Sequence, residues 1–217
     1  MEGKSRIIEE VKVEIKKQFE GEGTGHDWWH MVRVVNNALT IGRAENGNLF
    51  LIELSAWLHD IGDHKFHEET DAQERLITQI LDDVGLKKEI QKEILAIVAS
   101  VSYKGAKVET LPSTLEGQVV QDADRLDAIG AIGIARAFAY GGNKERLLYH
   151  PGQPPVIHND FQAYKNDKGH TINHFYEKLL LLKERMQTST GKKMAEDRHV
   201  YMESFLSQFY KEWEGKE

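Results

Sequence analysis

The sequence predicts an all-α protein in which residues 1–217 fold as one domain. Apolar residues recur three to four positions apart along most of the chain, which is the spacing of an amphipathic helix. Alternating apolar and polar stretches of strand length are nearly absent, and we find neither an internal repeat nor a low-complexity tract. The chain has 217 residues, of which 40% are hydrophobic, and this is enough for one sizeable core.

The helices are expected to follow one another with short breaks. Asp27 is placed to cap the second helix, Gly47 ends that segment, and Gly85 is the stop of the helix 72–84. Small side chains from Ala128 to Ala135 would allow neighbouring backbones to approach closely. The expected helices cover residues 7–19, 27–44, 49–58, 72–84, 90–101, 115–140, 172–186 and 194–213.

The helical pattern fails between Gly141 and Gly169, where glycine and proline are frequent. A loop of this length inside a compact domain is typical of a lid, a binding loop or an arm that joins copies of a homo-oligomer. We therefore expect helices up to about residue 140, a long loop at about 141–169, and C-terminal helices over 170–217.

Composition excludes several classes of protein. The formal net charge of -7 argues against a broad electrostatic grip on duplex nucleic acid, although it leaves room for a local basic pocket that binds a small phosphate ester. The chain has no cysteine, so disulfides and thiolate metal sites are excluded. No apolar run is long enough for a membrane span, and the N-terminal stretch lacks the apolar region of a signal peptide. A cytoplasmic protein is expected.

Three groups of metal-competent residues lie inside helical apolar patterns. His30 belongs to the first group, and His59 and Asp60 stand side by side at the end of the apolar run 49–58. The third group holds Asp122 and Asp124, which on a helix point about 200° apart, so at most one of them can bind the same ion in regular geometry. Imidazole nitrogens and carboxylate oxygens together suit a divalent metal of intermediate hardness.

The order of these residues closely resembles the HD-domain metal-dependent phosphohydrolases. The resemblance covers roughly residues 25–140 and includes Arg33, three positions after the first histidine, and the segment Ala123–Leu126 around the last aspartate. It implies an HD-type helical bundle in which one divalent cation is ligated by His30, His59, Asp60 and Asp124.

A single-metal site is expected, because the further histidines of two-metal members have no counterpart between His67 and Asp124. The nitrogen and oxygen ligands favour Mn²⁺, with Co²⁺, Ni²⁺, Fe²⁺, Zn²⁺ or Mg²⁺ as alternatives. Such a cation can lower the pKa of water and neutralise charge on a phosphoryl oxygen.

The sequence also resembles small stand-alone bacterial HD proteins that act on nucleotides. The resemblance therefore implies a nucleoside or deoxynucleoside triphosphate pyrophosphohydrolase that releases the monophosphate and pyrophosphate. Asp63 lies three residues after Asp60, where related enzymes often carry a glutamate that orients the attacking water, and it is the candidate base. The alternatives are a nucleoside monophosphatase, a cyclic-nucleotide phosphodiesterase, or a nucleotide-sensing HD module without turnover, which the shorter Asp63 carboxylate would favour.

Phosphate recognition requires cations near the metal. The candidate cations in or next to the motif segments are Arg33, Lys65, Lys104 and Arg136. His26, four residues before His30, is a further candidate for substrate binding. Among the aromatic residues, Trp29 is expected in the core, whereas Tyr140 is open between core packing and base stacking.

Overall fold

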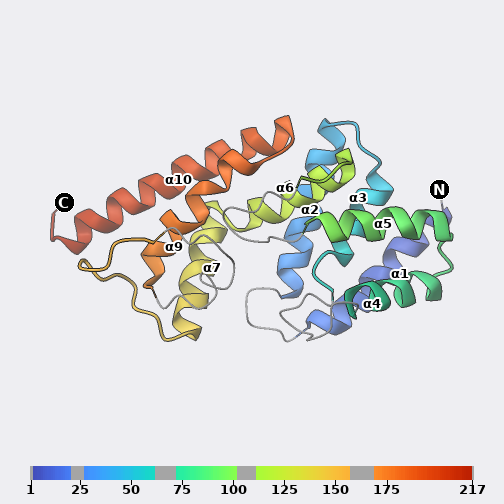
Figure 1. The fold of residues 1–217 in the computed structure, drawn as a ribbon, viewed down its shortest axis with the longest axis horizontal. Helices are drawn as coiled ribbons and strands as arrows, with labels where there is room; N and C mark the ends of the chain where they lie inside the picture. Colours follow the sequence, from blue (N-terminus) through green and yellow to red (C-terminus); the bar gives the residue numbers. More distant parts are fainter. Residues whose placement is uncertain (1, 21–26, 62–71, 102–110, 157–168, 217) are drawn as a thin grey trace. The chain divides into compact units, whose positions relative to one another are not determined.

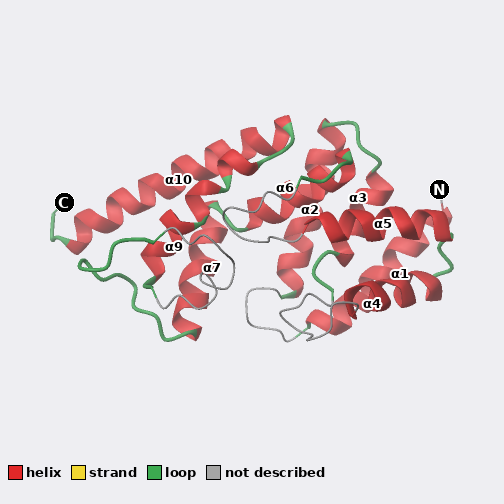
Figure 2. Cartoon of the chain, in the orientation of Figure 1, coloured by secondary structure: helices red, strands yellow, loops and turns green. Residues whose placement is uncertain are grey.

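The computed structural model describes residues 2–20, 27–61, 72–101, 111–156 and 169–216. Within these ranges the chain forms helices, turns and loops but no strand (Figures 1 and 2). The all-α prediction is confirmed. The helices are α1 (Glu2–Phe19), α2 (Trp28–Ala44), α3 (Leu49–Leu58), α4 (Ala72–Asp83), α5 (Lys88–Val101), α6 (Leu115–Asp127), α7 (Gly130–Asn143), α9 (Thr171–Glu177) and α10 (Ser189–Trp213), with 3₁₀ turns η1 (Leu179–Leu181) and η2 (Lys183–Arg185).

The described helices group into two compact units. The first holds α1 to α5 and α6 up to Ala123, and the second holds α6 from Asp124 together with α7, α9 and α10. Helix α6 is thus continuous across the boundary. The assignment of residues 1–217 to one domain stays a prediction.

The first unit is built around α3. Eight of its ten residues are buried, which explains why its sequence is apolar on all sides. It packs against α1, α2 and α5. Gly42 and Gly47 allow the backbone to approach Ile52 of α3 closely. A Cβ atom added at Gly42 would lie 2.7 Å from Ile52 Cδ1, and one added at Gly47 would lie 2.8 Å from it. The most buried helix is therefore the one that ends at the His-Asp pair.

The second unit has an aromatic core. Phe175 on α9 is fully buried and stacks on Phe205 of α10, with ring centroids 5.8 Å apart. Phe138 of α7 contacts both rings, at 6.1 Å from Phe175 and 5.9 Å from Phe205. Aromatic packing of this kind adds to the burial of apolar area. Helices α7, α9 and α10 are therefore joined through one cluster.

Helices α1 and α10 begin earlier than predicted, at Glu2 and Ser189, and the larger departures lie between residues 115 and 186. The expected helix 115–140 is interrupted after Asp127, because Gly130 adopts a φ of 74°, which ends the helical path. Helix α7 then continues past Gly141, where a Cβ would lie only 2.2 Å from Thr171 Oγ1, so tight packing holds this glycine in the helix. Residues 172–186 form a short helix and two 3₁₀ turns instead of one helix.

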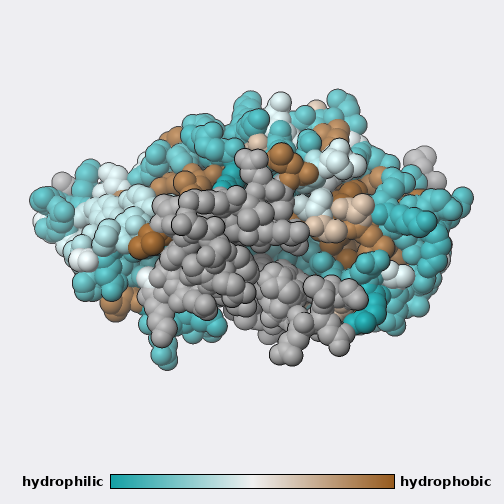
Figure 3. All heavy atoms as spheres, in the orientation of Figure 1, coloured by the Kyte–Doolittle hydropathy of each residue, from teal (hydrophilic) through white to brown (hydrophobic). Residues whose placement is uncertain are grey.

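No helix in the described part of the chain is both long enough and apolar enough to cross a membrane. On the face drawn in Figure 3, hydrophilic residues surround smaller groups of apolar ones.

His174 of α9 gives the second unit a pH-dependent stability. Burial, and then the positive charges of Lys178 and Arg146, lower the pKa of this histidine from 6.5 to about 3. Below about pH 6.5 the unfolded chain therefore binds a proton that the folded chain does not, and the free energy of unfolding decreases as the pH falls towards 3. We expect a slope approaching about 1.4 kcal/mol per pH unit in this window.

Urea denaturation at pH 7, 6 and 5 measures this slope. The variant His174→Gln is expected to flatten it, whereas His150→Gln, at an exposed position, keeps it. Equal slopes for the wild type and His174→Gln would show that other groups set the acid sensitivity.

Candidate metal centre

His30 is delivered by the first turn of α2. The Asp27 carboxylate accepts a hydrogen bond from the backbone N–H of His30 at 2.7 Å, so the predicted N-cap is confirmed. The cap fixes where the helix begins and therefore which face His30 occupies. His30, Val34 and Ile41 are all buried and lie on one face of the helix.

His59 and Asp60 stand where α3 ends. Helix α3 covers 49–58, the bounds that the sequence predicted, and His59 is its C-cap residue. The backbone then tightens, because Ile61 N–H donates to Leu58 O at 3.3 Å. The exposed fraction is 4% for His59 and 7% for Asp60, although both residues are polar. The apolar helix therefore carries a polar pair into the interior of the first unit.

The three side chains converge. His30 Nε2 lies 3.4 Å from Asp60 Oδ2, and His59 Nε2 lies 3.7 Å from Asp60 Oδ1. The two imidazole rings meet edge to face, with centroids 5.5 Å apart. Among the described residues, these three form a group whose ligand atoms all lie within 4.8 Å of one another. Helices α2 and α3, adjacent in the first unit, bring them together.

The hydrogen bonding of His59 fixes which nitrogen faces the group. His59 Nδ1 lies 2.8 Å from Ala56 O, and a carbonyl oxygen can only accept, so Nδ1 carries the proton. In a neutral imidazole the lone pair is then on Nε2, the nitrogen beside Asp60. Metal-binding histidines are commonly oriented in this way by a backbone carbonyl.

The geometry of the group fits a divalent cation. Ligand atoms about 2.1 Å from one ion lie about 3.0 Å apart at right angles and about 3.4 Å apart at tetrahedral angles. The separations of 3.4 and 3.7 Å are close to these values and longer than most N–H···O hydrogen bonds. The exposed fraction of His30 is 0%, so all three residues of the group are buried.

The comparison with known proteins identifies the family. The HD domain matches residues 28–129. The protein YpgQ of Bacillus subtilis is 35% identical over 211 residues, which cover 95% of this chain and 94% of YpgQ. The chain belongs to the HD-domain family. The resemblance based on the three motif segments is thereby confirmed.

Two crystal structures support the assignment of this HD-domain protein. An HD-superfamily hydrolase from Bacillus thuringiensis is 42% identical, with a TM-score of 0.79 and coverage of 98% of this chain and 100% of its own. The structure of B. subtilis YpgQ in complex with ADP is 33% identical, with a TM-score of 0.76 and coverage of 97% and 96%. The HD-domain protein is accordingly a metal-dependent phosphohydrolase, with the His-His-Asp group as its candidate metal site.

The two candidate aspartates of α6 fall on different sides of the unit boundary. Asp122 lies in the first unit and is fully buried, so it is not a charge on the helix surface. Asp124 is half-buried and lies in the second unit, in the last turns of α6. Its role as the fourth ligand stays a prediction.

Most of the predicted catalytic and substrate-binding residues lie outside the described part of the chain, namely Asp63, Lys65, Lys104 and His26. Arg33 is half-buried on α2. Arg136 on α7 donates to the carboxylate of Asp127 at 2.8 Å. The roles of both arginines in substrate binding stay predictions.

One aromatic prediction was wrong. Trp29 is 64% exposed, because successive positions on a helix point about 100° apart and its neighbour His30 takes the buried direction. Trp28 instead stacks on Trp57 of α3, with centroids 5.2 Å apart and planes 12° apart. Tyr140 is 46% exposed, with the Lys144 ammonium 5.8 Å from its ring centroid.

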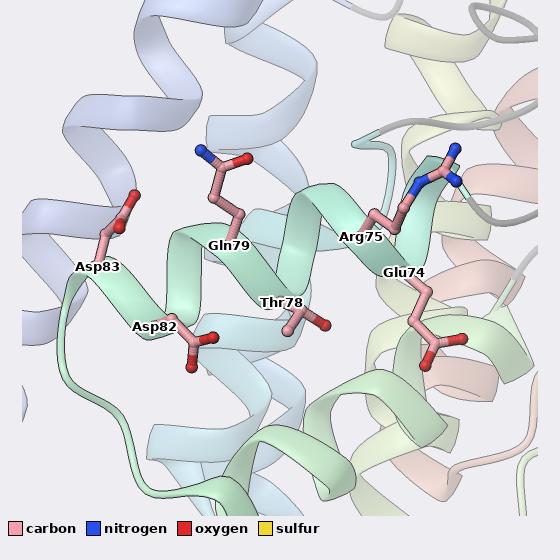
Figure 4. A pocket seen from close by; sticks show the side chains of 6 residues that line it. All are labelled: Glu74, Arg75, Thr78, Gln79, Asp82 and Asp83. Carbon is pink, nitrogen blue, oxygen red and sulfur yellow. The ribbon is translucent and has the colours of Figure 1, made fainter.

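A separate depression of about 670 Å³ follows α4. All its lining residues come from that one helix, and Figure 4 shows their side chains fanning out to both sides of the ribbon. None of the His-His-Asp residues lines it. Side chains that diverge in this way give no convergent set for binding a ligand.

Proposed function

We propose that this protein hydrolyses nucleoside or deoxynucleoside triphosphates to the monophosphate and pyrophosphate. In this proposal one divalent cation, with Mn²⁺ favoured, is held by His30, His59, Asp60 and Asp124. The observation that carries the proposal is the buried convergence of two imidazoles and a carboxylate.

Nucleotides are the favoured substrates for two reasons. The sequence resembles small HD proteins that act on nucleotides, and the similar B. subtilis YpgQ was crystallised in complex with ADP. A diphosphate nucleotide contains the base, the sugar and a phosphoanhydride. A triphosphate adds the leaving group that the proposed reaction requires.

The residues of the site have distinct parts in the reaction. A bound divalent cation supplies Lewis acidity that neutralises phosphoryl charge and makes water more acidic. The backbone carbonyl of Ala56 holds the His59 ring with Nε2 directed at the site. Burial of His30 and Asp60 keeps bulk water from competing with the ligands.

Asp63 is proposed as the base that accepts the proton of the attacking water. The water oxygen forms the new bond to the α-phosphorus, and the bond from that phosphorus to the bridging oxygen breaks. Pyrophosphate is the leaving group. Arg33, Lys65, Lys104, Arg136 and His26 are the residues proposed to bind the phosphates.

Product analysis tests the function. We expect the purified full chain with Mn²⁺ to convert a ribo- or deoxyribonucleoside triphosphate into the monophosphate and pyrophosphate, detected by phosphorus NMR. Parallel incubations use Co²⁺, Ni²⁺ and Mg²⁺, and a heat-treated sample is the control.

Each competing function gives a different result. Inorganic phosphate released from a monophosphate would indicate a monophosphatase, and opening of a cyclic nucleotide would indicate a phosphodiesterase. Tight nucleotide binding with no product over hours would indicate a sensing module. Any of these outcomes overturns the pyrophosphohydrolase proposal.

A further inference from the structure

The last turn of α6, which directly follows Asp124, is held by an ion pair from α7. Arg136 Nη1 lies 2.8 Å from Asp127 Oδ2 and 3.2 Å from Asp127 O. Asp127 is 1% exposed, so its carboxylate is desolvated and its charge is balanced inside the second unit. A buried pair of this kind fixes geometry, because breaking it leaves an uncompensated charge.

A second arginine reaches the same turn from α10. Arg198 Nη1 donates a hydrogen bond to Leu126 O. Burial lowers the pKa of Arg198, whereas the nearby Asp127 carboxylate opposes this shift. This contact could not be predicted from the sequence, because Arg198 is 72 residues from Leu126 and belongs to none of the motif segments.

Gly130 makes room for the Arg198 side chain. A Cβ at Gly130 would lie 3.0 Å from both Cβ and Cγ of Arg198. The φ of 74° at this residue also turns the chain from α6 into α7. The sequence predicted that a neighbouring backbone approaches this small-residue segment. At Gly130 the atoms that approach closely are those of the Arg198 side chain.

A third arginine extends from α6 itself. Arg125 Nη1 donates to Arg185 O in the 3₁₀ turn η2, which packs against α10. We call Arg125, Arg136 and Arg198, together with Asp127, the arginine clamp. Two of its contacts go to carbonyl groups in the last turn of α6, Asp127 O and Leu126 O, and Leu126 O also accepts a hydrogen bond from the Ile129 N–H at 3.3 Å.

We propose that the arginine clamp is a positioning device that fixes the direction in which Asp124 projects from α6 and thereby sets the affinity of the protein for its metal. This inference rests on the proposed function, in which Asp124 is the fourth ligand. The clamp residues bind the helix end and not the cation. Arg198 is the member to test, because it reaches the turn from a separate helix and has no other proposed role.

The decisive measurement is the Mn²⁺ affinity of the full chain, which is determined from the electron paramagnetic resonance signal of unbound Mn²⁺. Removing a partner that orients a ligand typically weakens metal binding about 10- to 100-fold, and we expect this for Arg198→Gln. Arg198→Lys keeps a donor and the charge and should lose less. Lys192→Gln, an exposed change on the same helix, should stay within about twofold of the wild type.

A double-mutant cycle separates positioning from general damage. In the background of Asp124→Ala, the clamp has no ligand to orient, so adding Arg198→Gln should weaken Mn²⁺ binding no further. A loss of affinity that adds fully to that of Asp124→Ala would mean that Arg198 acts on the protein as a whole, and it would overturn the inference. Unchanged Mn²⁺ affinity in a folded Arg198→Gln variant would also overturn the inference. If Arg198→Gln does not fold, the variants Arg198→Lys and Arg136→Gln replace it. Unchanged Mn²⁺ affinity in both of them would then decide against the clamp.

The reference variant distinguishes the two proposals. If Asp124→Ala binds Mn²⁺ as the wild type does, the fourth ligand of the proposed function is wrong and the clamp inference falls with it. If Asp124→Ala weakens binding while the arginine variants do not, only the clamp inference is wrong.

Discussion

Replacing His59 by alanine, or Asp60 by asparagine, is expected to abolish Mn²⁺ binding and to reduce turnover about 10²- to 10³-fold or more. A catalytic metal supplies several kcal/mol of transition-state stabilisation, and each 1.4 kcal/mol is a factor of ten in rate. Both residues belong to the buried group whose atoms lie within 4.8 Å. The Asp60→Asn change keeps nearly the same volume, so it removes charge without creating a cavity.

Three measurements on each variant separate loss of the metal from loss of the fold. The wild type should gain thermal stability with Mn²⁺, by about 2.7 kcal/mol at one hundred times the dissociation constant, and the variants should not. Circular dichroism of the metal-depleted proteins reports whether helices are intact. Nucleotide turnover is then compared at saturating Mn²⁺.

Matched substitutions complete this experiment. His150→Ala and Asp83→Asn change the same residue types at exposed positions and should leave binding and turnover unaltered. Asp63→Asn should retain Mn²⁺ but lose turnover, if its carboxylate is the base. Full activity of His59→Ala or Asp60→Asn would refute the metal centre, whereas a fall in stability with unchanged Mn²⁺ binding would make the group a structural ion pair.

The sequence predicted the parts of the fold that local periodicity determines. Helix α3 was predicted with both of its bounds, and the Asp27 cap of α2 was also predicted. Both features follow from residues within one or two turns of each other. His30 and Asp60 are thirty residues apart in the sequence, and their side chains approach to 3.4 Å. The geometry of this contact could be obtained only from the structure.

The errors of the sequence reading have a common cause, which is tertiary packing that overrides local pattern. The run from Ala128 to Ala135 keeps helical spacing, yet Gly130 turns the chain, and the structure places the Arg198 side chain beside it. Trp29 was assigned to the core from its residue type, whereas the face of α2 was decided by His30. The arginine clamp was missed for the same reason, because three separate segments contribute to it.

Phe175→Ala is expected to lower the free energy of unfolding by about 3–5 kcal/mol, the usual cost of removing a fully buried aromatic side chain. The ring joins α9 to α10 through Phe205, and it contacts Phe138 of α7, so its loss leaves a cavity between three helices. Urea denaturation measures the change, with Leu148→Ala as a control at a residue that is 55% exposed and should cost less than about 0.5 kcal/mol.

The same substitution connects the core of the second unit to the metal. Helix α10 carries both Phe205 and Arg198, so a loosened aromatic cluster should also weaken the hold of Arg198 on Leu126 O. Mn²⁺ affinity of Phe175→Ala should therefore fall under conditions where the protein is still folded, and Phe175→Leu, which refills most of the volume, should recover part of it. A large loss of stability with unaltered Mn²⁺ affinity would show that the position of α10 does not control the metal site.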